Sequence, residues 1–271
     1  MLRSMFASPS DSDDSSDDEE GNSNNENINS EIVSDKDIKH TSINGNTVIC
    51  LKQNKLLGIA HQLWPAATLL CDYLEANMHT LYPNNTSNNM NILELGAGIG
   101  LCGIFLAKLG YAYNVVITDL QEAQSLMSDN IILNNVQDKV HASELCWSNP
   151  DHVHDIFNTY FKHTTIANSG SSSSSVQYTP TLVIASDCVY WEHLFEPLYN
   201  TILLLTTVYN CDIIISHVKR WKKDTKFFNM CQRNGHMTVE KLIEKIDIIN
   251  DVYDNTPRRH IHRIYKISKK K

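Results

Sequence analysis

The stretch from Asn91 to Asp119 constrains the fold more than any other part of this chain. It contains an apolar strand at Ile92–Leu95, a turn with glycine at positions 96, 98 and 100, a helical pattern and a second apolar strand that ends in Asp119. Glycine lets the backbone pass close to a ligand, and an acid at the end of the second strand can accept hydrogen bonds from ribose hydroxyls. The stretch therefore predicts a site for a nucleoside-containing cofactor.

Strand-like and helix-like patterns alternate along the rest of the chain. Strands are expected at 47–52, 141–145, 181–185, 212–216, 238–246 and 259–267, and helices from Trp64 onward and at 121–135, 194–208 and 221–232. The runs TLVIA and DIIIS are apolar throughout, which is typical of strands covered on both faces. The alternation predicts an α/β fold with a doubly wound, mostly parallel sheet that binds ligands beyond the carboxyl ends of its strands.

The acidic residues are concentrated at the N-terminus. Residues 1–46 contain eleven Asp or Glu and three Lys or Arg, a net charge of −8 that equals the charge of the whole chain. Because such polar segments bury too little apolar surface to offset the entropy of ordering, we expect a disordered acidic tail over residues 1–45. Residues 46–271 should form one domain with a flexible serine-rich insertion near residues 155–180.

Composition argues against several partners. A formally neutral domain does not favour nucleic acid, and no apolar run approaches the roughly 18 residues that a membrane span needs. The seven cysteines have no CxxC spacing, so we expect a reducing compartment and a cytoplasmic protein. The lysines at 269–271 could in addition act as a weak nuclear address. The pairs His152/His154 and His260/His262 lack the further ligands of a metal site, so we expect no metal.

Two cofactor classes fit the glycine turn. A G-x-G-x-x-G pattern typical of dinucleotide sites can be read from Gly98 to Gly103, and Asp119 fits that interpretation as well. In a dinucleotide fold, however, the first glycine of the pattern follows the strand directly, and here that position belongs to Gly96. The register therefore favours the E-x-G-x-G-x-G arrangement from Glu94 to Gly100.

Five segments together resemble the family 16 (methyltransferase-like 21 group) protein-lysine methyltransferases. They are LWPAA at 63–67, ELGAGIG at 94–100, TDL at 118–120, LCW at 145–147 and SDCVY at 186–190, the last with a D-x-x-Y motif. The resemblance covers residues 45–267 and implies the seven-strand fold of class I S-adenosylmethionine-dependent methyltransferases. It also implies methylation of a lysine in a non-histone protein, for example a chaperone, a translation factor or an ATPase.

The resemblance assigns cofactor contacts to residues at the expected carboxyl edge of the sheet. These are Trp64, Glu94, Gly96, Ala97, Gly98, Asp119, Trp147 and Ser186. Asp119 would bind the ribose hydroxyls, Trp147 would lie against the adenine, and Ser186 would line the adenine or the methionine amino group. Trp64 would cover the sulfonium, whose positive charge is attracted to an aromatic face.

The same resemblance implies that Asp187 and Tyr190 are catalytic. A lysine amine must lose its proton before it can attack, which costs roughly 4.6 kcal/mol at pH 7 in water. Desolvation lowers this cost because it disfavours the cation. Asp187 would first attract the ammonium and Tyr190 would orient the neutral amine, whereas Arg220 and Trp221 would contact the protein substrate.

Other functions stay open at this point. The chain could methylate another protein side chain or a small molecule, or it could be a catalytically inactive cofactor-binding scaffold. An amino-methyltransferase of the nucleic-acid type would carry an Asp/Asn-Pro-Pro-aromatic motif after the strand at 181–185, and Asp187–Tyr190 lacks that motif.

Overall fold

The structure, a computed structural model, describes residues 37–83, 90–161, 163–167, 174–178, 181–220, 223–233, 235–250 and 257–270. These residues belong to one compact unit. Its elements are β1 (Ile38–Thr41), β2 (Val48–Leu51), η1 (Lys55–Leu57), η2 (Ile59–His61), α1 (Pro65–Leu81), β3 (Asn91–Leu95), α2 (Leu101–Lys108), β4 (Asn114–Asp119), η3 (Gln121–Ala123), α3 (Gln124–Leu133), β5 (Val140–Glu144), α4 (Pro150–Tyr160), β6 (His163–Ala167), β7 (Ser174–Tyr178), β8 (Thr181–Ser186), η4 (Glu192–Leu194), α5 (Phe195–Thr207), β9 (Asp212–Lys219), α6 (Asp224–Arg233), β10 (Met237–Asn250) and β11 (Pro257–Lys269).

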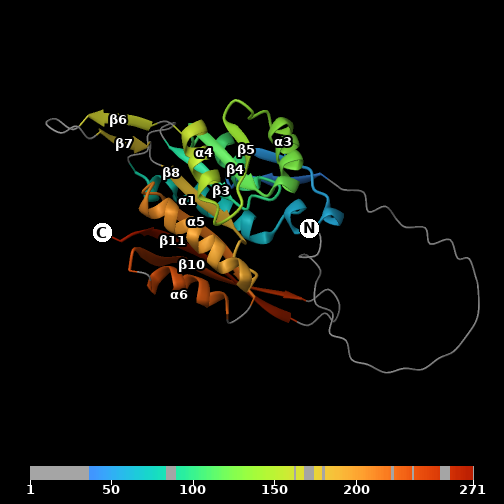
Figure 1. Ribbon diagram of the computed structural model, residues 1–271. Helices are drawn as coiled ribbons and strands as arrows, with labels where there is room; N and C mark the ends of the chain where they lie inside the picture. Colours follow the sequence, from blue (N-terminus) through green and yellow to red (C-terminus); the bar gives the residue numbers. More distant parts are fainter. Residues whose placement is uncertain are drawn as a thin grey trace, which may run out of the picture. The chain divides into compact units, whose positions relative to one another are not determined.

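Seven strands form the main sheet in the order β10-β11-β9-β8-β3-β4-β5 (Figure 1). The five strands from β9 to β5 run parallel, whereas β11 is antiparallel to both β9 and β10. This arrangement confirms the predicted α/β class with a doubly wound, mostly parallel seven-strand sheet. The pairs β1–β2 and β6–β7 form two further two-stranded sheets.

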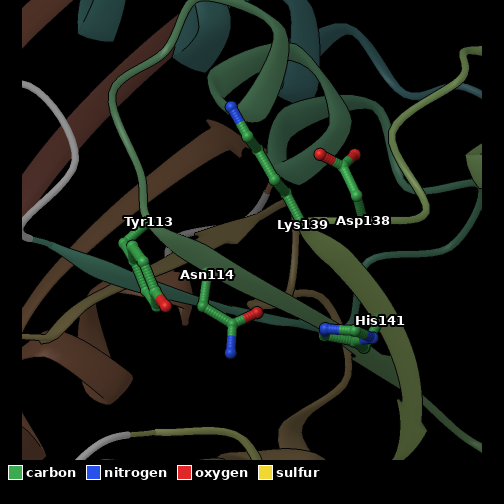
Figure 2. A pocket seen from close by; sticks show the side chains of 5 residues that line it. All are labelled: Tyr113, Asn114, Asp138, Lys139 and His141. Atoms are coloured by element: carbon green, nitrogen blue, oxygen red, sulfur yellow. The ribbon is translucent and has the colours of Figure 1, made fainter.

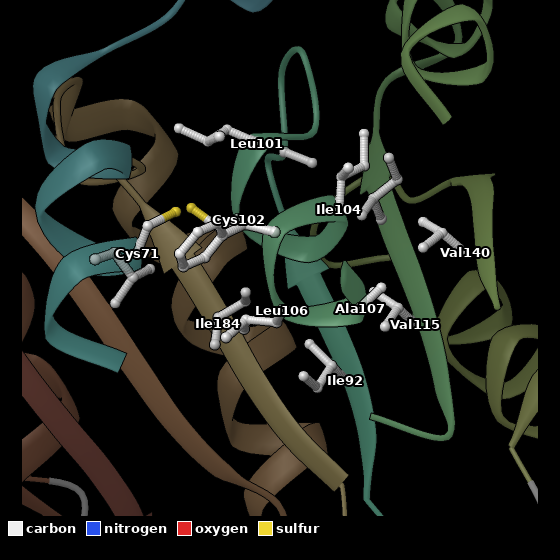
Figure 3. Close-up of a cluster of buried hydrophobic side chains, with 14 of the residues drawn as sticks. Cys71, Ile92, Leu101, Cys102, Ile104, Leu106, Ala107, Val115, Val140 and Ile184 are labelled. Atoms are coloured by element: carbon white, nitrogen blue, oxygen red, sulfur yellow. The ribbon is translucent and has the colours of Figure 1, made fainter. Parts of the chain in front are cut away.

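Helices cover both faces of the sheet, and alternating side chains on the central strands divide the core into two layers. On β3, Ile92 packs with residues of α1, α2 and α3, whereas the next residue, Leu93, packs with residues of α4, α5 and α6. Figure 3 shows the first layer, in which Cys71 of α1 and Cys102 of α2 lie together above the sheet. None of the described helices is both long and apolar enough to cross a membrane.

One carboxyl group lies inside this core. Glu94 on β3 is only 1% exposed, and its Oε2 accepts a hydrogen bond from the Gly103 N–H of α2 at 2.7 Å. A Cβ at position 103 would overlap Ile117 and lie 2.9 Å from the same Oε2, so glycine is what allows α2 to approach the sheet this closely. Burial raises the pKa of Glu94 to about 8.

Regular structure begins before the predicted end of the acidic tail at residue 45. The strand β1 lies within that predicted tail and pairs antiparallel with β2. His40 of β1 is buried, with its ring centroid 4.9 Å from that of Phe105. The tail prediction was therefore wrong for residues 38–41, because β2 and α2 supply partners that the polar sequence IKHT does not reveal. Residues 1–36 lie outside the described part of the chain.

The predicted flexible insertion near residues 155–180 also contains regular structure. Helix α4 extends into it and buries Val153, Ile156 and Phe157 against the second core layer. The strands β6 and β7 then pair as an antiparallel hairpin. The flexibility of the insertion stays a prediction, and residues 168–173, which include the first serines of the run, lie outside the described residues.

We predict that Glu94→Gln changes how stability depends on pH. In the folded protein Glu94 keeps its proton up to about pH 8, whereas an unfolded glutamate loses it near the ordinary pKa of 4.5. Between these values the carboxyl opposes folding increasingly as pH rises. The stability of Glu94→Gln relative to wild type should therefore increase from pH 5 to pH 8, by on the order of a few kcal/mol.

Urea unfolding at several pH values measures this difference. Asp138→Asn is a matched control, since it removes an acid that is exposed rather than buried. Parallel pH profiles for wild type and Glu94→Gln would show that the buried carboxyl does not carry this pH dependence.

Candidate active site

The glycine turn follows β3 at the carboxyl edge of the sheet. Gly96, Gly98 and Gly100 have φ angles of +58°, +56° and +84°, in a region that residues with a Cβ rarely adopt. A Cβ on Gly96 would come within 2.7 Å of the Cys188 Sγ and 3.2 Å of the Trp147 ring. Glycine is therefore required here both by the backbone conformation and by the closeness of its neighbours.

Asp119, at the end of β4, fastens this turn. Its Oδ2 accepts a hydrogen bond from the Gly98 N–H and its Oδ1 accepts one from the Leu120 N–H, each at 2.8 Å. Burial raises the pKa of Asp119, and these two N–H donors oppose that rise. Because each carboxylate oxygen has two lone pairs, Asp119 can hold the turn and still accept hydrogen bonds from a ligand.

The short helix η2 (Ile59–His61) lies against the turn, an arrangement that sequence reasoning missed. The Ala60 carbonyl oxygen would lie 3.2 Å from a Cβ on Gly98. The neighbouring Ile59 carbonyl accepts a hydrogen bond from the Trp64 indole N–H at 2.9 Å. Through these contacts η2 positions the half-buried Trp64, which precedes the first residue of α1.

The loop after β8 is fastened on two sides. Ser186 ends β8 opposite Ser216 of β9. Asp187 has a φ angle of +58°, and its N–H donates to the Ser216 carbonyl at 2.8 Å. Because the buried Cys188 lies against Gly96, the same loop is held both to β9 and to the glycine turn.

Asp187 forms a bidentate ion pair with Arg220. The Arg220 Nη1 and Nη2 donate to the two carboxylate oxygens at 2.7 and 2.6 Å, and the Asp187 side chain is only 4% exposed. The hydrogen bonds to Asp187 raise the pKa of Arg220. The guanidinium carbon also lies 5.7 Å from the centroid of the Trp64 ring. Both carboxylate oxygens already hold a cation, so this arrangement does not support direct attraction of a lysine ammonium by Asp187.

Arg220 is itself held by buried groups that sequence reasoning missed. Its backbone N–H donates to the Asp224 Oδ2 at 2.9 Å, and the His217 Nε2 lies 3.5 Å from the same oxygen. Both side chains are almost fully buried. Burial lowers the pKa of His217 to about 4, so this histidine is neutral at pH 7. The apolar run DIIIS at 212–216 predicted a strand, but it gave no sign that His217, the next residue of β9, would pair with Asp224 of α6.

Tyr190 is half-buried in the same loop, and its ring centroid lies 5.0 Å from that of Trp191. Burial raises the pKa of Tyr190, and the nearby Cys188, Asp119 and Asp187 raise it further. Its hydroxyl is therefore neutral at pH 7 and can both donate and accept a hydrogen bond.

Most of the predicted site residues meet at the carboxyl edge of the sheet. They are Trp64, Gly96, Ala97, Gly98, Asp119, Trp147, Ser186, Asp187, Tyr190 and Arg220. Glu94 differs, because its carboxyl group is buried in the core and accepts a hydrogen bond from Gly103 of α2. Trp221 lies outside the described residues.

A cavity of about 420 Å³ lies at the opposite edge of the sheet. Figure 2 shows its lining, Tyr113, Asn114, Asp138, Lys139 and His141, at the amino ends of β4 and β5. None of the predicted site residues lines it, so it is separate from the candidate active site.

Comparison with known proteins identifies the family. A family model described as lysine methyltransferase matches residues 43–161 and 170–234. The protein-lysine N-methyltransferase EFM6 of Saccharomyces cerevisiae is 34% identical over 188 residues, which cover 65% of this chain and 71% of EFM6. The protein N-lysine methyltransferase METTL21A of Xenopus tropicalis is 29% identical over 219 residues, which cover 80% of this chain and 83% of METTL21A.

A third relative has a more specific name. EEF1A lysine methyltransferase 3 of Mus musculus is 36% identical over 98 residues, which cover 36% of this chain and 39% of that protein. The family model matches more than half of the length of this chain. The chain therefore belongs to the lysine methyltransferase family.

Proposed function

We propose that this lysine methyltransferase transfers a methyl group from S-adenosylmethionine to a lysine side chain of a non-histone protein. The observation that carries the proposal is the meeting of two groups of residues at one edge of the sheet. A glycine turn fastened by Asp119 lies beside the loop that carries Tyr190, and Cys188 of that loop packs against Gly96 of the turn. The glycine turn with Asp119 suits a nucleoside cofactor, and the loop with Tyr190 suits an amine.

The residues around the turn fit S-adenosylmethionine, which supplies a methyl group on a positively charged sulfur. The backbone of Gly96–Gly98 would pass along the methionine and ribose, and Asp119 retains lone pairs for the ribose hydroxyls. Trp147, packed beside Gly96, and Ser186 would contact the adenine end. Trp64, held by η2, would face the sulfonium with its ring.

Tyr190 is the residue that we assign to the target amine. Its neutral hydroxyl can accept a hydrogen bond from the amine and so orient the nitrogen lone pair, while the surrounding buried groups exclude water. Asp187 and Arg220 act as positioning residues. Their ion pair fixes the loop that carries Tyr190 and places the guanidinium against Trp64. Trp221, next to Arg220, remains a predicted contact for the protein substrate.

The partner classes stay those predicted from the resemblance, namely a chaperone, a translation factor or an ATPase in the cytoplasm. The name of the mouse relative makes EEF1A a suitable first purified protein to test. A lysate from cells that lack this protein supplies the other candidate substrates in native form.

The purified protein should bind S-adenosylmethionine and label a lysine in EEF1A or in a lysate protein. Calorimetry measures binding, and mass spectrometry after incubation with a methyl-deuterated cofactor identifies the modified residue. Asp119→Ala should weaken cofactor binding by at least about tenfold, because it removes the acceptor that fastens the turn. Asp138→Ala, at the opposite edge, is the matched control. Label on a residue other than lysine, or no cofactor binding, would contradict the proposal.

Tyr190→Phe should lower kcat by about tenfold or more while the Kd for S-adenosylmethionine stays within about twofold of wild type. The ring and its packing remain, but the hydroxyl that orients the amine is lost. Steady-state rates on the identified protein, with cofactor binding measured separately, test this. An unchanged kcat would remove Tyr190 from the catalytic role.

Arg220→Ala and Asp187→Ala should each lower kcat by roughly 10- to 100-fold, because small displacements at an active site have large effects on rate. The double variant should be little worse than either single variant, since both substitutions break one ion pair. Arg220→Lys should restore activity only in part, because lysine cannot form the bidentate contact. Independent, multiplicative effects of the two substitutions would show that the pair does not act as a unit.

A further inference from the structure

A groove borders the candidate active site between the start of α1 and the β10–β11 hairpin. It encloses about 420 Å³ and is lined by Leu63, Pro65, Thr68, Leu69, Asp72, Lys245, Asp247 and His262. The first five of these residues form the α1 wall, and the last three form the wall of the hairpin.

One end of the groove begins at the residues proposed to surround the target amine. Leu63 and Pro65 flank Trp64 in the chain. His262 pairs with Val218 of β9, two residues before Arg220, whose guanidinium lies 5.7 Å from the centroid of the Trp64 ring. The residues that line this end of the groove are thus neighbours, in the chain or across the sheet, of Trp64 and Arg220.

The hairpin that forms the second wall extends beyond the carboxyl edge of the sheet (Figure 1). β9 ends at Lys219 opposite Ile261, whereas β10 and β11 continue to the pair Asn250 and Pro257. Lys245 pairs with His262 and lies two residues from Asp247, so all three side chains share the face that lines the groove. The hairpin thus projects on the side of the molecule where a protein substrate must approach.

The lining carries a net negative charge at pH 7. Asp72 and Asp247 oppose one Lys245, and burial lowers the pKa of His262, which is then neutral. Asp247 lies 3.3 Å from the Lys245 Nζ, so that acid is already paired. Asp72 is 46% exposed, and His40, whose pKa is lowered by burial, lies 3.8 Å from it. Glu75 and Lys245 also act on the charge of Asp72, but in the described part of the chain neither forms an ion pair with it. Asp72 is thus the acid on the rim best placed to meet an incoming cation.

The size and the apolar part of the groove suit a short extended peptide. The helical rise from Pro65 to Asp72 is about 10 Å, which matches about three residues of extended chain at 3.3 Å each. Leu63, Pro65 and Leu69 offer an apolar wall between the mouth and Asp72. The chain's own N-terminal segment is a poor occupant, because residues 1–36 hold ten Asp or Glu and two Lys or Arg.

We infer that this groove receives the segment of the substrate protein next to the target lysine. It favours an apolar side chain against Leu63, Pro65 and Leu69, and a lysine or arginine that pairs with Asp72 within about four residues of the methylated position. This inference rests on the proposed function, since it requires a lysine to enter beside Trp64 and Tyr190.

The charge reversal Asp72→Lys tests the inference. A lysate from cells that lack the protein is incubated with methyl-deuterated S-adenosylmethionine and each variant, and labelled lysines are mapped and quantified by mass spectrometry. Asp138→Lys, which makes the same charge change at the exposed amino edge of the sheet (Figure 2), is the matched control. Calorimetry with S-adenosylmethionine confirms that each variant is folded, and Asp72→Asn provides a milder second variant.

We expect Asp72→Lys to lower labelling of the wild-type sites by at least about tenfold while cofactor binding stays within about twofold of wild type. Asp72→Asn should give a smaller loss, and Asp138→Lys should give none. Replacing the flanking basic residue of the mapped substrate by glutamate should impair wild type and restore labelling by Asp72→Lys.

Two outcomes overturn the groove assignment alone. They are unaltered labelling by Asp72→Lys, and mapped sites without lysine or arginine within four residues. If wild type binds the cofactor but labels no lysine, the proposed function fails and the groove inference falls with it. The two failures are therefore distinguishable.

Discussion

The rest of the site depends on the left-handed backbone of the glycine turn. Because Gly96 has no Cβ, Trp147 and Cys188 can pack directly against the end of β3, and Cys188 brings the loop after β8 with it. Because Gly98 also has no Cβ, the Ala60 carbonyl of η2 can pack against the turn. Asp119 then holds the turn through the Gly98 N–H. A single side chain in the turn would separate three segments that are far apart in sequence.

A second constraint is electrostatic. The Asp187 side chain is 4% exposed and the Arg220 side chain is 32% exposed, and each would carry an uncompensated charge without the other. Their bidentate contact joins the loop after β8 to the end of β9, and the Asp224 carboxylate extends the network to α6. The guanidinium also reaches Trp64 at the start of α1. One ion pair thus fixes four elements around the proposed amine site. It joins Asp187, which the sequence analysis expects to be catalytic, to Arg220, which it expects to contact the protein substrate.

The sequence predicts what local patterns encode and misses what depends on register between distant segments. The run from Ile92 to Asp119 carries its strand, turn and helix in adjacent residues, so its structure could be predicted. Helix α4 was predictable too, since Asn149 caps it and Val153, Ile156 and Phe157 follow helical spacing, but the nearby serine run masked that signal. No pattern could pair Asp187 with Arg220, because their contact is set by how β8 and β9 align. The place of η2 against Gly98 is likewise tertiary.

The pairing of Asp187 changes how the chemistry of the site is understood. A bare carboxylate beside the target would stabilise the lysine ammonium and so increase the roughly 4.6 kcal/mol needed to form the neutral amine at pH 7. Arg220 cancels that charge, and Tyr190 adds a neutral hydroxyl rather than an anion. The positively charged sulfur of a bound cofactor would disfavour an ammonium further. Under the proposed function, such a site would select the deprotonated amine where the reaction occurs. Attraction of basic residues that flank the target lysine would fall to acids farther out, such as Asp72.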